Sequence, residues 1–229
     1  MSATQDQAGI QFESRSIERE WINWLRTLPD PLPALRTFTR HYHYFSLNQV
    51  VAFSRLLAAL TPTDRESMTV LAQVLFEELG EGKLQSVHSI LFERFSKSVG
   101  IAGVELPLSP SQVLNGVRWY VCELELAFGG SSLPRALATY CFLESSAVAT
   151  YPPLLEALRA QGFSEGDLEF FVRHATIEVE HAATANRLVE RANLSGEQGI
   201  AFDDQLRLLE KCWRAFWEDI SKACQQAYT

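Results

Sequence analysis

The 229-residue sequence has few cysteines, and their spacing does not suit a metal site. Cys122, Cys141, Cys212 and Cys224 lie far apart, and no pair forms a CxxC motif. This spacing argues against a zinc ribbon, an iron–sulfur cluster or a framework of disulfides. We therefore expect four reduced cysteines in helical surroundings.

Runs of positive charge and long apolar runs are also missing. The formal net charge is −8, and no run of lysine or arginine exceeds a local pair, so nucleic acid is not an expected partner. No apolar stretch approaches the length of a membrane span. The polar, acidic N-terminus lacks the basic start and apolar core of a signal peptide, which leads us to expect a cytoplasmic protein without a membrane partner.

Strict alternation of polar and apolar residues is absent as well, whereas helical periodicity runs through nearly every segment. The sequence therefore predicts an all-α protein, a bundle of seven or eight helices. We expect a flexible N-terminus at residues 1–14 and a single helical domain at 15–229, since 47% hydrophobic content is ample for one core. The predicted helices cover about 16–28, 33–60, 64–80, a segment from 83, 111–128, a long helix from about 133 with a kink or break at Pro152 and Pro153, 165–191 and 201–227.

Histidine is scarce, yet two of the five histidines fall close together with a carboxylate between them. His174, Glu178 and His181 are spaced by four and three residues, so on a helix they project from consecutive turns toward one point. Imidazole and carboxylate groups together suit iron, manganese or zinc. The alternative is an ordinary exposed helix face with a weak Glu178–His181 pair.

Further metal donors would have to come from other segments. His88 begins an amphipathic turn and faces inward with its apolar neighbours, although buried neutral histidine without metal is common. Glu81 would share a face with His88 on a continuous helix, but two glycines flank it. A break there would instead place Glu78 at the end of an inward-facing helix, so the residues alone leave Glu78 and Glu81 open.

Glu144 is the other candidate, because it lies in the apolar stretch ALATYCFLESSAVATY. A carboxylate in such surroundings must be paired, protonated or bound to metal, since an isolated buried charge costs many kcal/mol. The pattern is not that of a ferritin-like site, because the chain has one ExxH motif and Gln85 stands where a second would need glutamate. A zincin is excluded by the absence of HExxH.

Together these residues resemble the haem-oxygenase-like diiron oxidase and oxygenase family of iron-containing redox enzymes. The matching pieces are GluGluLeuGlyGluGly at 77–82 followed by His88, then Glu144, then HisAlaThrIleGluValGluHis at 174–181. The resemblance favours Glu78 over Glu81 and implies six ligands for two Fe(II)/Fe(III) ions: Glu78, His88, Glu144, His174, Glu178 and His181. The family usually has aspartate at the place of Glu178, and an extra carboxylate of some relatives would fall near Ala52 and Phe53, where it is missing.

By this resemblance the chain is an O2-dependent non-haem diiron oxidoreductase of specialised metabolism. The expected substrate is a small amino acid or carboxylate, with an aromatic body as one option. The expected reactions are N-oxygenation, desaturation or oxidative C–C cleavage to an alkene or nitrile. An external electron donor can take part. The residues expected to line a substrate pocket, or simply the core, are Phe76, Phe92, Phe95, Trp119, Tyr120, Tyr140, Phe142 and Tyr151.

Two alternatives remain open on the sequence alone. One is a metal-free hydrolase or lyase of the thiaminase type, for which Cys141 is the tempting nucleophile. The other is a non-catalytic metal-binding protein. A homodimer through the apolar face of Leu209, Trp213 and Trp217 is a further expectation, with packing inside the core as its alternative.

Overall fold

The computed structural model describes residues 14–60, 63–101 and 103–229, and all its regular elements are helices. Eight α-helices are present over these residues, with three short 3-10 turns and no strand. The predicted all-α bundle is therefore confirmed, with the larger of the two expected helix numbers. The helices are α1 (Ser14–Thr27), α2 (Leu32–Ala59), α3 (Arg65–Glu78), α4 (His88–Ser98), α5 (Asn115–Gly129), α6 (Leu133–Ala160), α7 (Glu169–Ala192) and α8 (Glu197–Tyr228).

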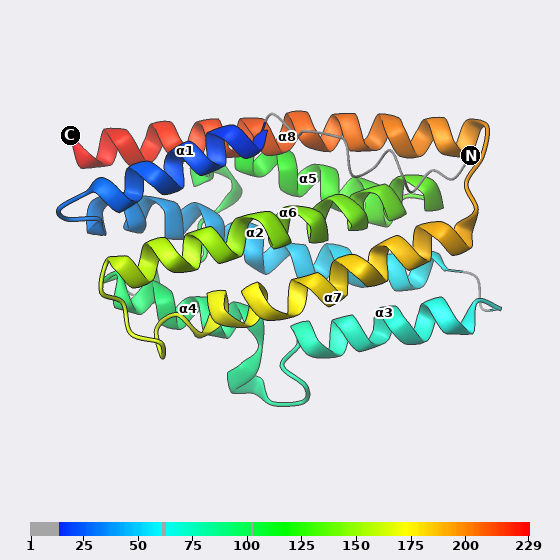
Figure 1. Ribbon diagram of the computed structural model, residues 1–229, viewed down its shortest axis with the longest axis horizontal. Helices are drawn as coiled ribbons and strands as arrows, with labels where there is room; N and C mark the ends of the chain where they lie inside the picture. Colours follow the sequence, from blue (N-terminus) through cyan, green and yellow to red (C-terminus); the bar gives the residue numbers. More distant parts are fainter. Residues whose placement is uncertain (1–13, 61–62, 102) are drawn as a thin grey trace.

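The helices run roughly along one long axis (Figure 1). The α1 helix packs on α6 and α8, while α2 crosses the interior between α5, α8 and the short helices α3 and α4. The α3 and α4 helices follow one another along one edge of the bundle, and α7 contacts both of them as well as α6. Because α7 spans both short helices, its side chains can meet groups from the end of α3 and the start of α4.

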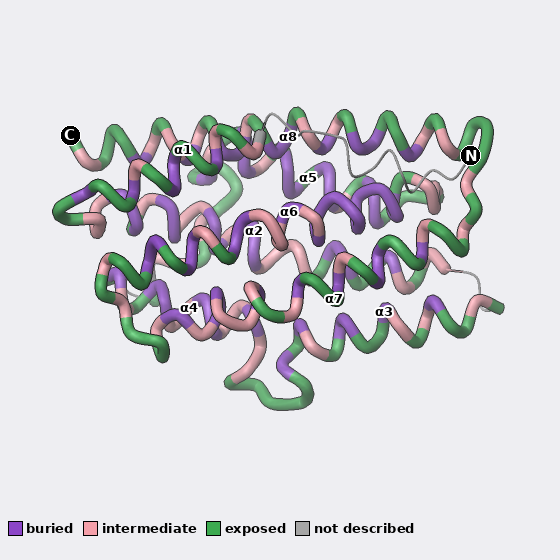
Figure 2. The backbone as a smooth tube through the Cα atoms, in the orientation of Figure 1, coloured by how far each residue is buried: buried purple, intermediate pink, exposed green. Residues whose placement is uncertain are grey.

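One hydrophobic core draws on all eight helices. Buried and exposed residues alternate along the turns of the helices, as Figure 2 shows, and this pattern is the amphipathic stripe expected of bundle helices. In α1 the stripe contains Glu18, which is as deeply buried as its neighbours Trp21, Ile22 and Leu25. Leu209, Trp213 and Trp217 are buried in the core of the single chain, which is the alternative that the sequence offered for this apolar face.

The sequence predicted a kink or a break of the helix at Pro152 and Pro153. No break occurs, because α6 continues through both prolines. Each proline lacks an N–H group and so removes one hydrogen bond of the helix. The buried Tyr151, Leu154 and Leu158 pack on either side of this step, and their burial offsets the loss. As a result, α6 contributes buried residues to the core along nearly its whole length.

Three predicted helix starts are also too early, because short turns precede the helices. A 3-10 turn at Leu84–Ser86 comes before α4, and another at Pro110–Gln112 comes before α5. Ser164 accepts a hydrogen bond from the backbone N–H of Asp167, as a cap would, but it closes a turn and α7 begins only at Glu169. Of the predicted flexible N-terminus, 1–13 lies outside the described residues, and Ser14 begins α1.

The α5 and α8 helices pack so closely that one glycine has no room for a side chain. A Cβ atom on Gly116 would lie 2.2 Å from the carbonyl oxygen of Ala215 in α8. We expect Gly116→Ala to lower the free energy of unfolding by about 3 kcal/mol, because two backbones must separate to accept the methyl group. Gly199→Ala is the matched control, since a Cβ there meets nothing within 4 Å, and it should raise stability by up to about 1 kcal/mol. Urea unfolding of both variants tests this, and equal effects would contradict the close packing.

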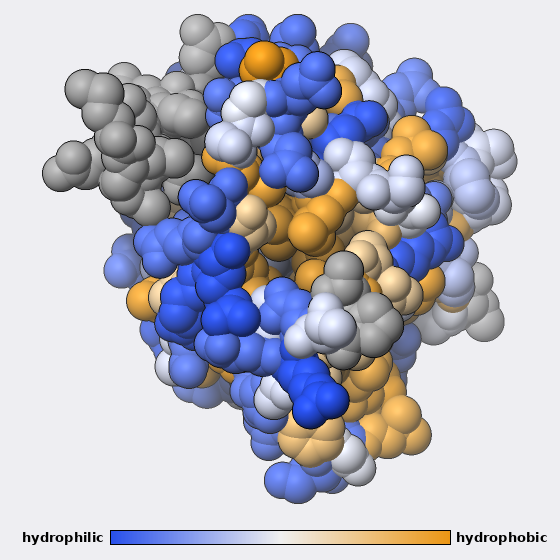
Figure 3. Space-filling model, turned by 90° about the vertical axis from the view of Figure 1, so that its right-hand side faces the viewer, coloured by the Kyte–Doolittle hydropathy of each residue, from blue (hydrophilic) through white to orange (hydrophobic). Residues whose placement is uncertain are grey.

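One end of the bundle carries a group of apolar side chains at its surface. At the end where α7 gives way to α8, apolar side chains lie in a hollow that polar side chains surround (Figure 3). None of the helices over the described residues is long and apolar enough to cross a membrane.

Candidate metal centre

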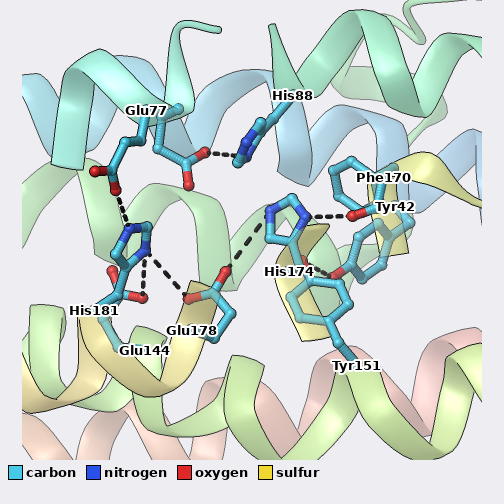
Figure 4. A network of polar contacts seen from close by, with 10 residues as sticks. Tyr42, Glu77, His88, Glu144, Tyr151, Phe170, His174, Glu178 and His181 are labelled. Carbon is cyan, nitrogen blue, oxygen red and sulfur yellow. Dashed lines mark hydrogen bonds and ion pairs between the residues drawn. The ribbon is translucent and has the colours of Figure 1, made fainter. Parts of the chain in front are cut away.

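The α7 helix carries three buried polar residues on consecutive turns of one face. His174, Glu178 and His181 are each at most 3% exposed, and all three project from α7 into the bundle (Figure 4). Glu178 lies between the two imidazoles: its Oε1 is 3.7 Å from His174 Nε2, and its Oε2 is 3.5 Å from His181 Nδ1. The longer arm of glutamate at this position therefore brings one carboxylate oxygen toward each histidine.

The turn between α3 and α4 brings two further donors to this face. Glu78 is the last residue of α3, and His88 is the first residue of α4. The chain reverses between them through Gly80, Glu81 and Gly82, which all have left-handed backbone conformations with φ of 80°, 55° and 78°. As a result the carboxylate Oε2 of Glu78 lies 3.0 Å from His88 Nδ1, and both side chains are buried.

Glu144 completes the set from the middle of α6. Its Oε2 lies 3.7 Å from His181 Nδ1, and the side chain is 6% exposed. Burial raises the pKa of Glu144 well above its ordinary value, and the neighbouring carboxylates of Glu178 and Glu78 raise it further. The structure therefore brings together the six residues that the sequence singled out.

Five of the six donors form two groups that overlap at one residue, and Glu144 lies beside the second group. Glu78, His88 and His174 can each offer a ligand atom within 4.8 Å of the others, and so can Glu78, Glu178 and His181. Three of these buried atoms lie close to other polar atoms but make no hydrogen bond of suitable geometry, namely His88 Nδ1, Glu178 Oε2 and His181 Nδ1. Buried polar atoms without partners cost free energy, and metal ions at these two positions would satisfy them. The residues thus fit a pair of metal ions, with Glu78 next to both.

The two histidines of α7 have very different electrostatic surroundings. Burial, together with the nearby imidazole of His88, lowers the pKa of His174 to about 3. Burial by itself would lower the pKa of His181, but the nearby carboxylate of Glu178 and the hydrogen bond that His181 donates to Glu77 outweigh burial, so that the pKa rises to about 9. His174 is therefore neutral near pH 7, ready to coordinate through a ring nitrogen, whereas His181 holds a proton until a cation replaces it.

Two glutamates beside the cluster differ from the sequence interpretation. Glu81, the alternative ligand, is exposed in the turn, and its side chain is not part of either donor group among the described residues. Glu77, which the sequence reasoning did not single out, lies 2.9 Å from His181 Nε2. The acidic pair Glu77–Glu78 was the sequence feature that could have indicated this contact. Adjacent residues of a helix point in different directions, so both carboxylates can reach the same site only if another helix packs close by.

A small cavity borders the carboxylates on the side away from α3. Its volume is about 10 Å³, which is room for about one water molecule. The hydroxyl groups of Tyr42 and Tyr151 are hydrogen-bonded at 3.0 Å on its wall. Of the aromatic residues expected around a pocket, Tyr120 and Tyr151 line it, whereas Phe76 and Trp119 are exposed on the surface. The lining residues are Tyr42, Phe45, Gln49, Tyr120, Leu143, Glu144, Ser146, Ala147, Thr150, Tyr151, Glu178 and Trp213.

Cys141 does not have the environment of a nucleophile. The side chain is buried, and its burial raises the pKa of the thiol to about 12. A nucleophilic cysteine needs a thiolate near neutral pH, which requires a lowered pKa. Its surroundings favour a structural role in the core.

Comparisons with known proteins identify the family and the fold of the chain. The model of a family described as iron-containing redox enzymes matches residues 36–210. A domain of unknown function with a haem-oxygenase-like fold from Shewanella denitrificans is 12% identical, and the alignment covers 100% of this chain and 96% of that one with a TM-score of 0.79. A CADD-like protein of unknown function from Nostoc punctiforme is 15% identical over 98% of this chain and 95% of that one, with a TM-score of 0.75.

At these identities the structural likeness shows the fold alone, which is the haem-oxygenase-like bundle expected from the sequence. No curated protein matches the sequence. The family match, by contrast, covers most of the chain, including the whole of the cluster. The chain belongs to the family of iron-containing redox enzymes.

Proposed function

We propose that this protein is an O2-dependent non-haem diiron oxidase or oxygenase. The observation that carries the proposal is the overlap of two buried donor groups at Glu78, which supports two ions next to each other rather than two separate sites. Imidazole and carboxylate donors suit iron, and the family is one of iron-containing redox enzymes. We assign six ligands to the pair of irons: Glu78, His88, Glu144, His174, Glu178 and His181.

When bound, two ferrous ions supply the electrons that reduce dioxygen. The chain itself holds the ions and keeps bulk water away. Glu78, Glu144 and Glu178 contribute negative charge that offsets the charge of two cations. The burial of all six side chains keeps the surroundings at a low dielectric, in which these charge interactions are strong.

The cavity beside Glu144 and Glu178 is our candidate for the place where a substrate meets the centre. Phe45, Tyr120 and Trp213 give it an aromatic wall, while Gln49 and the Tyr42–Tyr151 pair offer polar groups. This lining suits a small amino acid or carboxylate with an apolar, often aromatic, body. The reactions we propose are N-oxygenation, desaturation or oxidative C–C cleavage, with an external electron donor completing a cycle where the reaction needs one.

Anaerobic loading with iron tests the proposal. We expect the metal-free protein to take up two Fe(II) per chain and, once loaded, to consume dioxygen when air is admitted, whereas protein that received no iron should consume none. Elemental analysis and an oxygen electrode measure the two quantities. Two bound irons without any oxygen consumption, with candidate amino acids present or absent, would instead favour a metal-binding protein without enzymatic activity.

A metal-free hydrolase is the competing enzyme class, and Cys141→Ser separates it from the diiron enzyme. We expect this variant to bind iron and consume dioxygen as the unmodified protein does, because the buried thiol takes no part. Hydrolytic or lyase activity that survives exhaustive chelation and is lost in Cys141→Ser would contradict the diiron assignment.

A further inference from the structure

The imidazole of His181 has a hydrogen-bond partner on the side opposite the cluster. Its Nδ1 atom faces the carboxylates of Glu144 and Glu178, whereas its Nε2 atom lies 2.9 Å from Oε2 of Glu77 (Figure 4). A histidine that binds metal through one ring nitrogen carries its proton on the other. The partner of that proton fixes both the tautomer and the orientation of the ring.

His174 shows the same arrangement with a different partner. Its Nδ1 atom lies 2.7 Å from the backbone carbonyl of Phe170, one turn earlier in α7, so that Nε2 faces Glu178. The backbone of α7 thus orients His174. In His181 the roles of the two ring nitrogens are exchanged. Nε2 contacts Glu77 of another helix, α3, and Nδ1 faces the cluster.

Glu77 is itself held in place. Its Oε1 atom accepts a hydrogen bond of 2.7 Å from Gln73, one turn earlier in α3, which leaves Oε2 directed to His181. The side chain of Glu77 is 21% exposed, compared with 7% for the adjacent Glu78. Glu77 therefore lies at the edge of the cluster, where its Oε2 can accept a hydrogen bond from the imidazole N–H without being a metal ligand.

We propose that Glu77 is a positioning residue that holds His181 with Nε2–H outward and Nδ1 free for metal. The last turn of α3 then supplies both a ligand, Glu78, and the group that orients a ligand of α7. This inference rests on the proposed metal centre and adds to it a residue outside the six ligands. Glu77 would therefore affect the metal ion held by Glu78, Glu178 and His181. It would not affect the ion held near His88 and His174.

Titration of the metal-free protein with Co(II) tests the assignment, because its visible absorption reports each binding step. For the unmodified chain we expect two equivalents to bind. In Glu77→Ala one equivalent should bind as before and the other about 10–100-fold more weakly, as is usual when the partner of a metal-bound histidine is lost. Glu77→Gln should restore most of the affinity, since its amide oxygen can accept the same N–H.

Glu66→Gln is the matched control, because Glu66 also joins α3 to α7 through a 2.6 Å contact with Arg191 but does not touch the cluster. It should bind both equivalents normally. A second readout is the 15N spectrum of the Zn(II)-loaded protein, in which the Nε2–H signal of His181 should be present in the unmodified chain and in Glu77→Gln, and lost by exchange in Glu77→Ala.

Unchanged affinity for both equivalents in Glu77→Ala would overturn the assignment. Equal weakening in Glu66→Gln would also overturn it, since general docking of α3 would then be the cause. If the unmodified chain binds one equivalent only, the two-metal centre fails. In that case the role of Glu77 is supported if the single ion binds more weakly in Glu77→Ala but not in Glu66→Gln. It is contradicted if Glu77→Ala binds the ion as the unmodified chain does.

Discussion

Replacing Glu78 by glutamine should abolish tight binding of both metal ions, not one. Glu78 belongs to both donor groups, so its carboxylate is next to each ion. An amide oxygen carries no charge, and the remaining donors of either group then leave a cation poorly neutralised. We expect both affinities to fall by more than about a hundredfold, because even residues that only orient metal ligands contribute 10–100-fold. Elemental analysis after gel filtration, together with Co(II) titration, measures the loss.

Glu81→Gln is the control for this variant. It removes the same charge three residues later in the chain, from a side chain that is exposed in the α3–α4 turn. Its metal content should equal that of the unmodified protein. A Glu78→Gln variant that keeps one tightly bound ion would show that Glu78 binds only one of the two ions. A loss of metal in Glu81→Gln would show that Glu81 is a ligand.

The second large effect concerns Glu18, far from the candidate metal centre in sequence. Glu18→Gln should raise the free energy of unfolding at pH 8 by about 3 kcal/mol and leave it unchanged at pH 4. Burial raises the pKa of Glu18 from 4.5 to about 7, and nearby Thr150, Trp213, Arg15 and Arg19 oppose this rise only in part. At about 1.4 kcal/mol per pKa unit, the folded chain loses about 3 kcal/mol of stability as the pH rises from 4.5 to 7.

The sign follows from which state binds the proton more tightly. Below pH 4.5 the carboxyl is protonated in both the folded and the unfolded chain, and above pH 7 the folded chain must keep a buried charge. Glutamine resembles the protonated acid and removes this cost. Glu20→Gln, on the exposed side of α1, is the matched control and should change stability by less than about 0.5 kcal/mol at either pH. Chemical denaturation at both values measures the difference, and an equal effect at pH 4 and pH 8 would contradict the burial of Glu18.

The donors on α7 could be predicted from the sequence because they depend on one helix. Spacings of four and three residues place His174, Glu178 and His181 on one face whatever the rest of the chain does. Glu144 could be inferred from its apolar neighbours, since a carboxylate within a core stripe of a helix needs a partner. Local geometry and burial were sufficient for these four residues.

The contribution of α3 and α4 could not be derived in the same way. Whether Glu78 or Glu81 faces His88 depends on where α3 ends and how the chain turns, and three successive left-handed residues decide it. The contact of Glu77 with His181 depends on how α3 lies against α7, which no local pattern encodes. Likewise, Pro152 and Pro153 were expected to disturb α6, but the packing of their neighbours in the core outweighs the two lost hydrogen bonds.

The cavity beside Glu144 and Glu178 has a consequence for how the protein would work. With room for about one water molecule, it is too narrow to admit an amino acid while Tyr42, Tyr120 and Trp213 keep their present positions. On the proposed function, a substrate can enter only when these aromatic rings move apart, so each reaction would begin with a movement of the protein rather than with chemistry. The closed arrangement would keep other molecules away from the oxygens and nitrogens of the centre, and the rate at which the rings move would set an upper limit on turnover.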